Sequence, residues 1–514
     1  MKNKIFQELV TNKSYMLMSI IISIMTMLPN IILATSEIRM YLLSIVILIL
    51  ISKISKSIFI FIVFYINLVN ILIIHIALHW GYLYPDITSR LYVMALSPKY
   101  EMLEYVKKYL DYKDMLMVFY ISGVFYLLFM YARRFEHTFK ILKVISLIFV
   151  LIVVSGVGSS GRFNREPYNV ASKIITLFDV QDYVEKRRDY LKTTINSKDI
   201  QSKEMLYDKV VVVVGESVNK HHMKIYNYDK NTTPFFSSMV KNQNLFVFEA
   251  IAPANLTRYA VPILLTKAHV HDFIDAFVHS GSIVTDFYKF GYTTKWISNQ
   301  GRVGRTDSVI TEISNEAQTQ TFFNESDYLS AKSDQVILDY LSSQHKNNFK
   351  EMVVIHLMGS HTDYSKRYTP QHSFYKKPSN TIEQYDNTIY FTDYILKNIY
   401  KYYYQQDKKL LLVYFSDHGE VVSQEKSGHG YSPGYSDEYE VPFIVYSSIK
   451  NKRLKKLLME NKKHYFNMEN ANFIIKYIAG LRNDANISYS SKIFTLDPKY
   501  IIDYEKLKKY GESL

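Results

Sequence analysis

The stretch KLLLVYFSDHGE, residues 409–420, joins an apolar run to a cluster of ionisable side chains. Such a run is typical of a strand in a parallel sheet, because helices cover both faces of that kind of sheet. In α/β folds, catalytic and binding groups gather beyond the carboxyl ends of the strands. Asp417, His418 and Glu420 stand at that end. They either belong to a functional site or only cap a turn, and the rest of the chain must decide between these readings.

Similar apolar runs recur between residues 206 and 514. They predict strands at about 209–215, 244–250, 293–298, 352–358, 409–415 and 441–447. Helical patterns separate the runs, and the longest is NTIEQYDNTIYFTDYILKNIYKYY at residues 380–403. Strands that alternate with helices predict a mostly parallel central sheet covered on both faces, that is, an α/β/α domain.

Polar side chains follow the other predicted strands as well. They are Glu216 after VVVVVG, Asn299 in WISNQ, His356 and His361 in VVIHLMGSH, and His429 in SGHGYS. Taken alone, a glutamate at a strand end more often caps a helix or joins a surface ion pair. Two carboxylates and several imidazoles at one sheet edge, however, are oxygen and nitrogen ligands that suit zinc. The set therefore predicts a zinc site with one position left for a reacting group.

A hydroxyl group completes this candidate site. In APANLTRYAVPILLTKA, residues 252–268, Thr257 stands just ahead of a helix-like apolar run. The positive end of a helix and a nearby metal would both lower the pKa of a hydroxyl and prepare it as a nucleophile. Local sequence alone favours the simpler reading, in which Thr257 only caps the helix.

The first 157 residues contain five long apolar runs. These runs cover residues 15–34, about 40–52, 57–79, 115–131 and 140–157. About 20 apolar residues cross a bilayer as a helix. A signal peptide would account for only the first run, and no cleavage site with soluble sequence follows it. We expect a transmembrane domain of five helices at residues 1–157, a bridging segment or plain linker at 158–205, and a catalytic domain at 206–514.

Flanking charges predict how this domain is oriented. Alternate connections are rich in cations, while TSEIR and residues 80–114 carry little positive bias. By the positive-inside rule, the N-terminus lies in the cytoplasm and everything after residue 157 lies outside. The cations that set this orientation are Lys2, Lys4, Lys13, Lys53, Lys56, Arg133, Arg134 and Lys140.

Composition excludes several classes of protein. The chain has 514 residues, 48% of them hydrophobic, which supplies an ample core. A net charge of +13 invites a nucleic-acid partner, but the cations are scattered and form no reader motif, so we expect no nucleic-acid binding. Anionic lipid headgroups suit such a membrane protein better. The absence of cysteine excludes disulfides, thiolate metal sites and a cysteine nucleophile.

The order of these motifs resembles one family over nearly the whole chain. It is similar to the phosphoethanolamine transferases of the Gram-negative envelope, membrane members of the alkaline phosphatase and sulfatase superfamily. The motifs that carry the resemblance are GESVNKHHMKIYNYDKNTTPF, NLTRYAVP, WISNQ, HLMGSH, YDNTIYFTDYIL and the series SDHGE, GHG and VPF. The resemblance implies a sulfatase-like fold and a zinc enzyme of the inner membrane with a periplasmic catalytic domain.

The same resemblance implies a role for each site residue. Zinc ligands would be Glu216, Thr257, Asp417 and His418, with Thr257 also the nucleophile. His361 and His429 would contact the transferred phosphoryl group or a second metal ion. Asn299 and Glu420 would line the substrate site.

The reaction implied is the transfer of phosphoethanolamine from phosphatidylethanolamine to an envelope glycan through a covalent threonine intermediate. The alternatives are a phosphoglycerol transferase of the same fold and an inactive envelope-binding scaffold. A sulfatase is disfavoured because NLTRYAVP lacks the C/S-x-P-x-R frame.

Two departures from the family bear on the acceptor and on rigidity. The family usually carries disulfides, which this chain cannot form. Where the lipid A branch has a lysine after the asparagine motif, this chain offers Arg302 and Arg305. The stretch WISNQ resembles the branch that modifies lipopolysaccharide core or other surface glycans, and the acceptor stays open among lipid A, core and O-antigen sugars.

Overall fold

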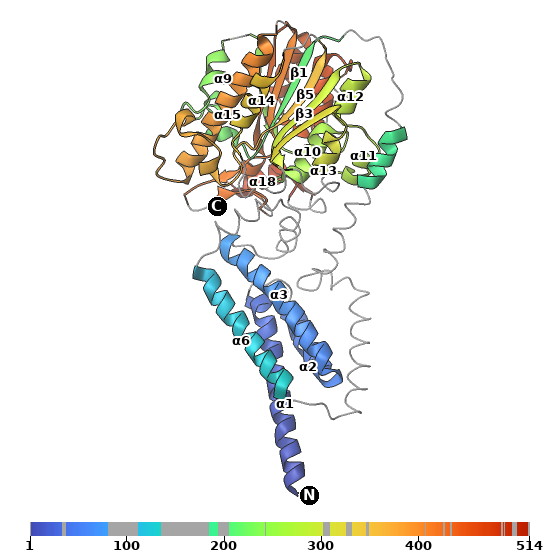
Figure 1. Cartoon of the computed structure of the whole chain (residues 1–514), viewed down its shortest axis with the longest axis vertical. Coiled ribbons are helices and arrows are strands. Elements are labelled where there is room, and N and C mark those ends of the chain that lie inside the picture. The colour runs from blue at the N-terminus through green and yellow to red at the C-terminus, as the bar shows by residue number, and fades with distance from the viewer. Residues whose placement is uncertain are drawn as a thin grey trace. The chain divides into compact units, whose positions relative to one another are not determined.

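The structure is a computed structural model. It describes residues 2–32, 38–80, 112–134, 184–193 and 205–511, apart from short gaps at 242, 302–308, 325–331, 346–348, 407, 425–426, 432–433, 485–486, 488 and 496–500. The chain divides into two compact units, the first within residues 1–178 and the second mainly formed by Asp179–Leu514 (Figure 1).

Four helices make up the described part of the first unit. They are α1 (Lys2–Ile32), α2 (Ile38–Ile54), α3 (Lys56–Trp80) and α6 (Tyr112–Arg134). The predicted apolar runs at 15–34, 40–52, 57–79 and 115–131 fall on these helices, whereas the run at 140–157 lies outside the described residues. Among the described residues, two segments, Ser14–Ile32 and Asp114–Arg133, are long and apolar enough to cross a bilayer. The count of five spans stays a prediction.

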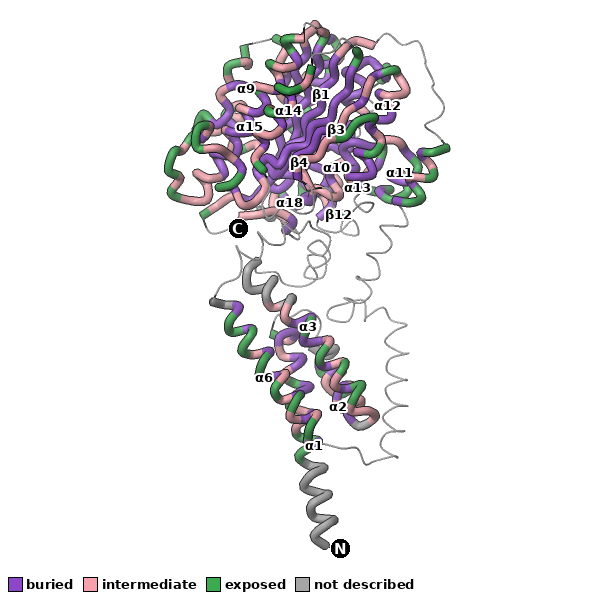
Figure 2. Tube along the Cα trace, in the orientation of Figure 1, coloured by how far each residue is buried: buried purple, intermediate pink, exposed green. Residues whose placement is uncertain are grey.

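Buried polar side chains form hydrogen bonds between helices α1 and α3. Asn30 Nδ2 donates to Asn70 Oδ1 at 2.8 Å, and Asn70 Nδ2 donates to the Thr26 carbonyl at 2.8 Å. Asn67 Nδ2 reaches Thr26 Oγ1 at 3.1 Å. All four residues are fully buried, while many large apolar residues of the unit are exposed (Figure 2).

An eight-stranded sheet forms the centre of the second unit, in the order β10-β2-β9-β6-β1-β5-β3-β4. Adjacent strands of this sheet run parallel, except that β9 runs antiparallel to both β6 and β2. The strands are β1 (Lys209–Gly215), β2 (Leu245–Ile251), β3 (Thr293–Gly301), β4 (Thr319–Asn324), β5 (Glu351–His356), β6 (Leu410–Ser416), β9 (Glu440–Ser447) and β10 (Phe466–Asn467). The mostly parallel sheet predicted from the sequence is confirmed.

The six predicted strands all occur, each within three residues of its expected limits. The sequence analysis missed β4, whose segment TQTFFN is only partly apolar and lies at the edge of the sheet. It also missed the two-residue strand β10 at the other edge and the two-stranded ribbons β7 (Val421–Val422) with β8 (Ser427–Gly428) and β11 (Lys492–Phe494) with β12 (Ile501–Asp503). Such short strands carry too little pattern to be recognised.

Helices cover both faces of the sheet, so the side chains of each central strand alternate between two apolar cores. On one face lie α10 (Thr257–Leu265), α11 (Phe273–Val278), α12 (Ile283–Lys289), α13 (Val309–Ser314), α16 (Lys452–Asn461) and α17 (Ala471–Ala479). The other face carries α9 (Pro234–Met239), α14 (Gln335–Ser343) and α15 (Thr381–Tyr404) (Figure 1). The last helix, α18 (Tyr504–Gly511), packs against a small cluster with Tyr439.

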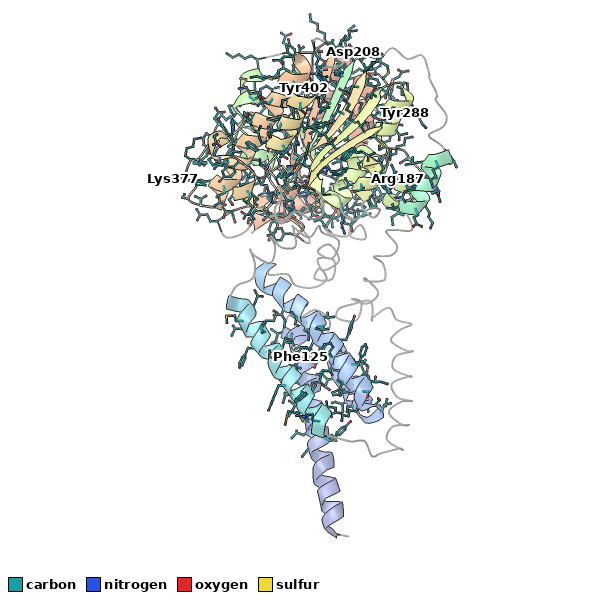
Figure 3. All side chains as sticks on the ribbon, in the orientation of Figure 1. Phe125, Arg187, Asp208, Tyr288, Lys377 and Tyr402 are labelled. Carbon is teal, nitrogen blue, oxygen red and sulfur yellow. The ribbon has the colours of Figure 1, made fainter. Side chains whose placement is uncertain are left out.

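The helix at residues 184–193 belongs to the second unit. Its Arg187, labelled in Figure 3, is fully buried and stacks over the Phe277 ring with its guanidinium carbon 4.2 Å from the ring centroid. Arg187 also forms an ion pair with Glu316 and donates to the Ser280 carbonyl at 2.5 Å. Beside it, Arg188 pairs with Glu312 at 2.7 Å. Part of the expected bridging segment is therefore firmly attached to the catalytic unit.

Candidate metal centre at the carboxyl edge of the sheet

The register of two neighbouring strands brings the candidate ligands together. In the pairing of β1 with β6, Gly215 lies opposite Ser416, so the next residues, Glu216 and Asp417, leave the sheet side by side. His418 follows immediately. All three side chains are fully buried. Buried ionisable groups are costly unless they are paired or bind an ion, so their convergence indicates a site.

His418 presents one ring nitrogen to both carboxylates. Its Nδ1–H donates to the Gly419 carbonyl at 2.9 Å. This bond fixes the ring and leaves Nε2 facing Glu216 Oε1 at 3.3 Å and Asp417 Oδ2 at 3.5 Å. A histidine held in this way through its other nitrogen is the usual arrangement of a metal-binding imidazole.

The Thr257 hydroxyl points into the same cluster. Thr257 is the first residue of α10, and its Oγ1 donates to Glu216 Oε2 at 3.0 Å and lies 3.2 Å from His418 Nε2. Leu256 occupies the capping position, and no side chain caps the helix. The hydroxyl thus contacts the site, and the simple helix cap considered for Thr257 is not what the structure shows.

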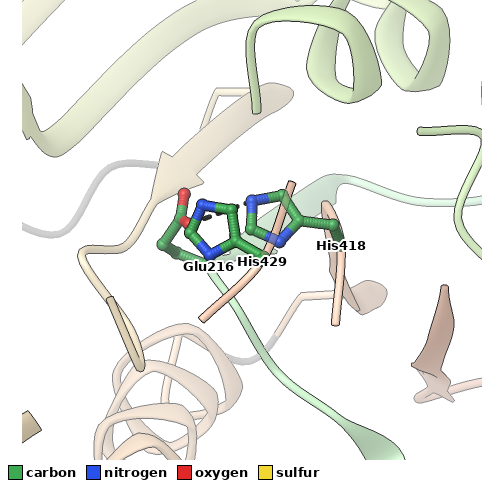
Figure 4. A group of neighbouring side chains, drawn as sticks. All are labelled: Glu216, His418 and His429. Atoms are coloured by element: carbon green, nitrogen blue, oxygen red, sulfur yellow. Dashed lines mark ion pairs between the residues drawn. The ribbon is translucent and has the colours of Figure 1, made fainter. Parts of the chain in front are cut away.

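His429 closes the group from a separate loop. Its Nδ1 lies 2.6 Å from Glu420 Oε2, and its ring centroid lies 4.1 Å from that of His418. One ligand atom each from Glu216, His418 and His429 lie within 4.8 Å of one another (Figure 4). Glu420 is itself fixed, because Tyr364 donates to its Oε1 at 2.5 Å. Glu420 therefore orients His429.

His361 lies at the outer side of the cluster. Its Nδ1–H donates to the Thr362 carbonyl at 2.7 Å, and its ring centroid is 6.1 Å from that of His429. The buried Arg367 holds the same turn by donating to the His361 carbonyl at 2.9 Å. Thr257, His361 and His429 are partly exposed, unlike the buried Glu216, Asp417 and His418. The accessible members are those that a substrate would meet.

The charges of the cluster depend on one another. Burial and the nearby Glu216 carboxylate raise the pKa of Asp417 to about 8. Burial alone would lower the pKa of His418, but Asp417 and Glu216 raise it to about 10. Burial likewise opposes ionisation of Glu216, yet the His418 imidazole holds its pKa well below the ordinary value. Two carboxylates that compete for one imidazole would both be stabilised by a bound cation.

Two predicted polar residues lie elsewhere. Asn299 Nδ2 donates to Asp334 Oδ1 and to the Lys332 carbonyl, both at 2.8 Å, so this amide braces a loop and does not reach the cluster. The next residue, Gln300, contacts Glu216 instead. His356 is buried in the core beside Trp296, and burial lowers its pKa to about 4. Arg302 and Arg305 lie outside the described residues.

Two buried carboxylates that the sequence analysis missed brace the site. Asp334 accepts hydrogen bonds from the amides of Met358 and Gly359 at 2.8 and 2.9 Å, which fixes the turn before His361. Glu438 Oε1 accepts from Asn255 Nδ2 at 3.0 Å and from the Tyr431 amide at 2.8 Å. It therefore joins the loop of Thr257 to the loop of His429. Neither carboxylate follows a recognisable strand, so no local pattern announced them.

The donor set fits zinc. Asp417 Oδ2 is buried and has no hydrogen-bond partner among the described residues, while Oδ1 accepts from the His418 amide at 2.7 Å. A buried acceptor of this kind is normally satisfied, and an ion would satisfy it. Carboxylate oxygens, imidazole nitrogen and a hydroxyl within one small cluster match the ligands that zinc takes.

An α/β/α sheet with acidic and imidazole groups at its carboxyl edge defines the alkaline phosphatase-like class of domain. The chain belongs to the sulfatase family, which matches residues 208–479. The fold class expected from the sequence is thereby confirmed for this domain, and so is the resemblance to phosphoethanolamine transferases.

Two curated relatives come from Escherichia coli K12. The putative transferase YhbX is 27% identical over 60% of this chain and 59% of its own length. The phosphoethanolamine transferase OpgE is 29% identical over 47% of this chain and 46% of its own length. The chain thus spans about three fifths or less of the length of these relatives.

Solved structures share the fold. The integral membrane lipooligosaccharide phosphoethanolamine transferase A from Neisseria meningitidis aligns with a TM-score of 0.59 at 16% identity, covering 91% of this chain and 94% of that one. The periplasmic domain of E. coli EptC in complex with Zn aligns with a TM-score of 0.50 at 21% identity, covering 60% and 95%.

Proposed function

We propose that the protein is a phosphoethanolamine transferase of the bacterial inner membrane that works through Thr257. One observation carries the proposal: the Thr257 hydroxyl lies 3.0 Å from Glu216 and 3.2 Å from His418 in a cluster that fits zinc. Relatives with phosphoethanolamine transferase names support the choice of transferred group. The multi-pass membrane domain, with the N-terminus in the cytoplasm and the catalytic domain in the periplasm, is part of the proposal.

Glu216, Asp417, His418 and Thr257 would hold one zinc ion, and His429, whose ring centroid lies 4.1 Å from that of His418, would be a ligand of any second one. Bound zinc would lower the pKa of the threonine hydroxyl and neutralise charge on the phosphoryl oxygens. The Zn complex of the related EptC domain supports this choice of metal.

In the first step, Thr257 Oγ forms a bond to the phosphorus of phosphatidylethanolamine, and the bond from phosphorus to the diacylglycerol oxygen breaks. The hydroxyl proton leaves along the hydrogen bond to Glu216, and Glu216 returns it to the departing diacylglycerol oxygen. His361 and His429, the accessible imidazoles, stabilise charge on the transferring group. The product is phosphoethanolamine bound to Thr257.

In the second step, an acceptor oxygen attacks the same phosphorus and the bond to Thr257 breaks. The threonine recovers a proton as the acceptor loses one. We propose a lipopolysaccharide component as acceptor, either a core sugar, an O-antigen sugar or lipid A. Glu420 would act in this reaction only by orienting His429, because its two carboxylate oxygens are hydrogen-bonded to Tyr364 and to His429.

The test is to incubate the purified full chain with zinc and phosphatidylethanolamine and to analyse its peptides by mass spectrometry. We expect the mass of one phosphoethanolamine group on the peptide that contains NLTRY. A glycerol phosphate adduct from phosphatidylglycerol would instead support the phosphoglycerol transferase. Absence of any adduct from a zinc-loaded, folded protein would refute both and favour the binding scaffold.

A further inference from the structure

We infer that Gln300 is a positioning residue that holds the Glu216 carboxylate in the orientation needed to bind the metal. The inference rests on the proposed function, in which Glu216 is a zinc ligand. Gln300 Nε2 donates to Glu216 Oε2 at 3.2 Å and to the Leu357 carbonyl at 2.8 Å. The amide thus ties the ligand that follows β1 to the backbone that follows β5.

The other carboxylate oxygen of Glu216 has a donor of its own. Ser217 Oγ donates to Glu216 Oε1 at 2.8 Å and lies 3.4 Å from His429 Nδ1. Gln300 and Ser217 therefore restrain the carboxylate from its two ends. Thr257 Oγ1 shares Oε2 with Gln300, so the position of Gln300 also determines where the Thr257 hydroxyl finds its acceptor.

The backbone gives Gln300 little freedom to lie elsewhere. The pairing of β3 with β4 shifts register between Ser298 and Gly301, so Asn299 and Gln300 lie where the regular pairing is interrupted. The Asn299 side chain donates a hydrogen bond to Asp334, and the backbone N–H of Gln300 donates to Ser298 Oγ at 3.1 Å. With the Asn299 side chain and the Gln300 backbone held in this way, the Gln300 side chain is directed to Glu216.

Hydrogen bonds to a ligand change how well it binds a metal. Groups that orient a metal ligand commonly contribute 10- to 100-fold to metal affinity, roughly, because they fix its geometry before the ion arrives. Gln300 would act in this way on Glu216. It contacts neither substrate nor metal in this assignment.

The test compares zinc affinity in Gln300→Met, which keeps the length of the side chain but removes its donor. Affinity of the full chain is measured by competition with a chromophoric chelator, and transfer is measured with phosphatidylethanolamine. We expect zinc binding weakened about 10- to 100-fold, a lower kcat at limiting zinc and an almost unchanged KM for the lipid. The matched control is Gln320→Met at an exposed position of β4, which should equal wild type.

A purely structural role for Gln300 would lower the melting temperature and leave zinc affinity unchanged, and that result would overturn the inference. Gln300→Asn, whose amide is one methylene too short, should weaken zinc binding in the same way and serves if the methionine variant does not fold. If wild type binds zinc but forms no Thr257 adduct, the proposed function fails, while weaker zinc binding in the variant still supports the role of Gln300. If wild type binds no zinc, both fail.

Discussion

The helical unit and the sulfatase domain place polar and apolar side chains in opposite ways. In the helical unit, Asn30, Asn67 and Asn70 are fully buried, while Leu116 and Phe119 are 72% and 82% exposed. In the sulfatase domain, the central strands are apolar and fully buried, and buried charge gathers at the carboxyl edge of the sheet (Figure 2).

This difference reflects the two solvents that we propose for the units. Lipid does not penalise exposed Leu or Phe, and helices within it associate through close packing and hydrogen bonds between polar side chains. In water, burial of apolar surface supplies most of the driving force for folding. A buried charge is costly there unless it is paired or binds a metal ion. Buried asparagine is therefore structural in the first unit, whereas the buried carboxylates that gather at the carboxyl edge of the sheet in the second indicate function.

The comparison is tested most severely at Thr257. If the polar cluster of the sulfatase domain exists for chemistry, Thr257→Ala should abolish transfer and the covalent adduct, because the variant lacks the hydroxyl proposed to attack phosphorus. The domain should remain folded by circular dichroism. Thr257→Ser keeps an oxygen and should retain part of the activity. An alanine variant that still transfers phosphoethanolamine would refute the mechanism.

The next largest effect is expected at His418. Since Nε2 faces Glu216 and Asp417 at 3.3 and 3.5 Å, His418→Ala should remove bound zinc together with activity. Zinc content per chain, measured by elemental analysis, checks this expectation. His279→Ala, at an exposed histidine after α11, is the matched control and should keep its zinc. Full zinc occupancy in the His418 variant would show that this residue is not a ligand.

A smaller effect concerns a buried carboxylate that serves structure in the sulfatase domain. Asp393 accepts from the amides of Phe235 and Phe236 at 2.7 and 3.2 Å, and burial raises its pKa to about 7. A folded pKa above the unfolded value of about 3.9 means that its contribution to stability is complete below about pH 4 and is lost as the pH rises through 7.

Asp393→Asn should therefore flatten the pH dependence of the free energy of unfolding between about pH 4 and 7, by at most about 1.4 kcal/mol per pH unit. Chemical denaturation at several pH values measures this slope. Asp339→Asn, on an exposed turn of α14, is the control. An identical slope in wild type and Asp393→Asn would contradict the assignment.

The smallest effect should come from the helical unit. Asn70→Ala removes the bonds to Asn30 and to the Thr26 carbonyl and should cost roughly 0.6–1.7 kcal/mol, as such bonds do in membranes. Unfolding of the full chain in mixed micelles by added SDS measures this loss. Leu68→Ala, at an outward-facing position of α3, should cost less. A larger loss of stability in Leu68→Ala than in Asn70→Ala would indicate that this unit lies in an aqueous environment.

Sequence reasoning succeeded where a local pattern carries the information. The apolar runs of β1 and β6 place Glu216, Asp417 and His418 at strand ends, and parallel pairing brings those ends together. It failed where the outcome depends on register. The shift at the end of β3 directs Gln300, not Asn299, to Glu216, and no residue type near it announces that shift.

Long-range contacts were equally hidden from the sequence. Glu438 contacts Asn255, which lies 183 residues away along the chain, so no spacing rule indicates the pair. Edge strand β4 was missed because its partly apolar segment gives a weak strand pattern.

The hydrogen bonds of Glu438 determine what the domain needs in order to fold its site loops. Glu438 joins the loops of Thr257 and His429 by hydrogen bonds to an amide side chain and to backbone N–H groups, in a chain without cysteine. Formation of these bonds needs neither an oxidase nor a disulfide isomerase, and a reducing agent has no bond to break there. The site geometry is therefore independent of the thiol redox balance of the compartment in which the domain folds.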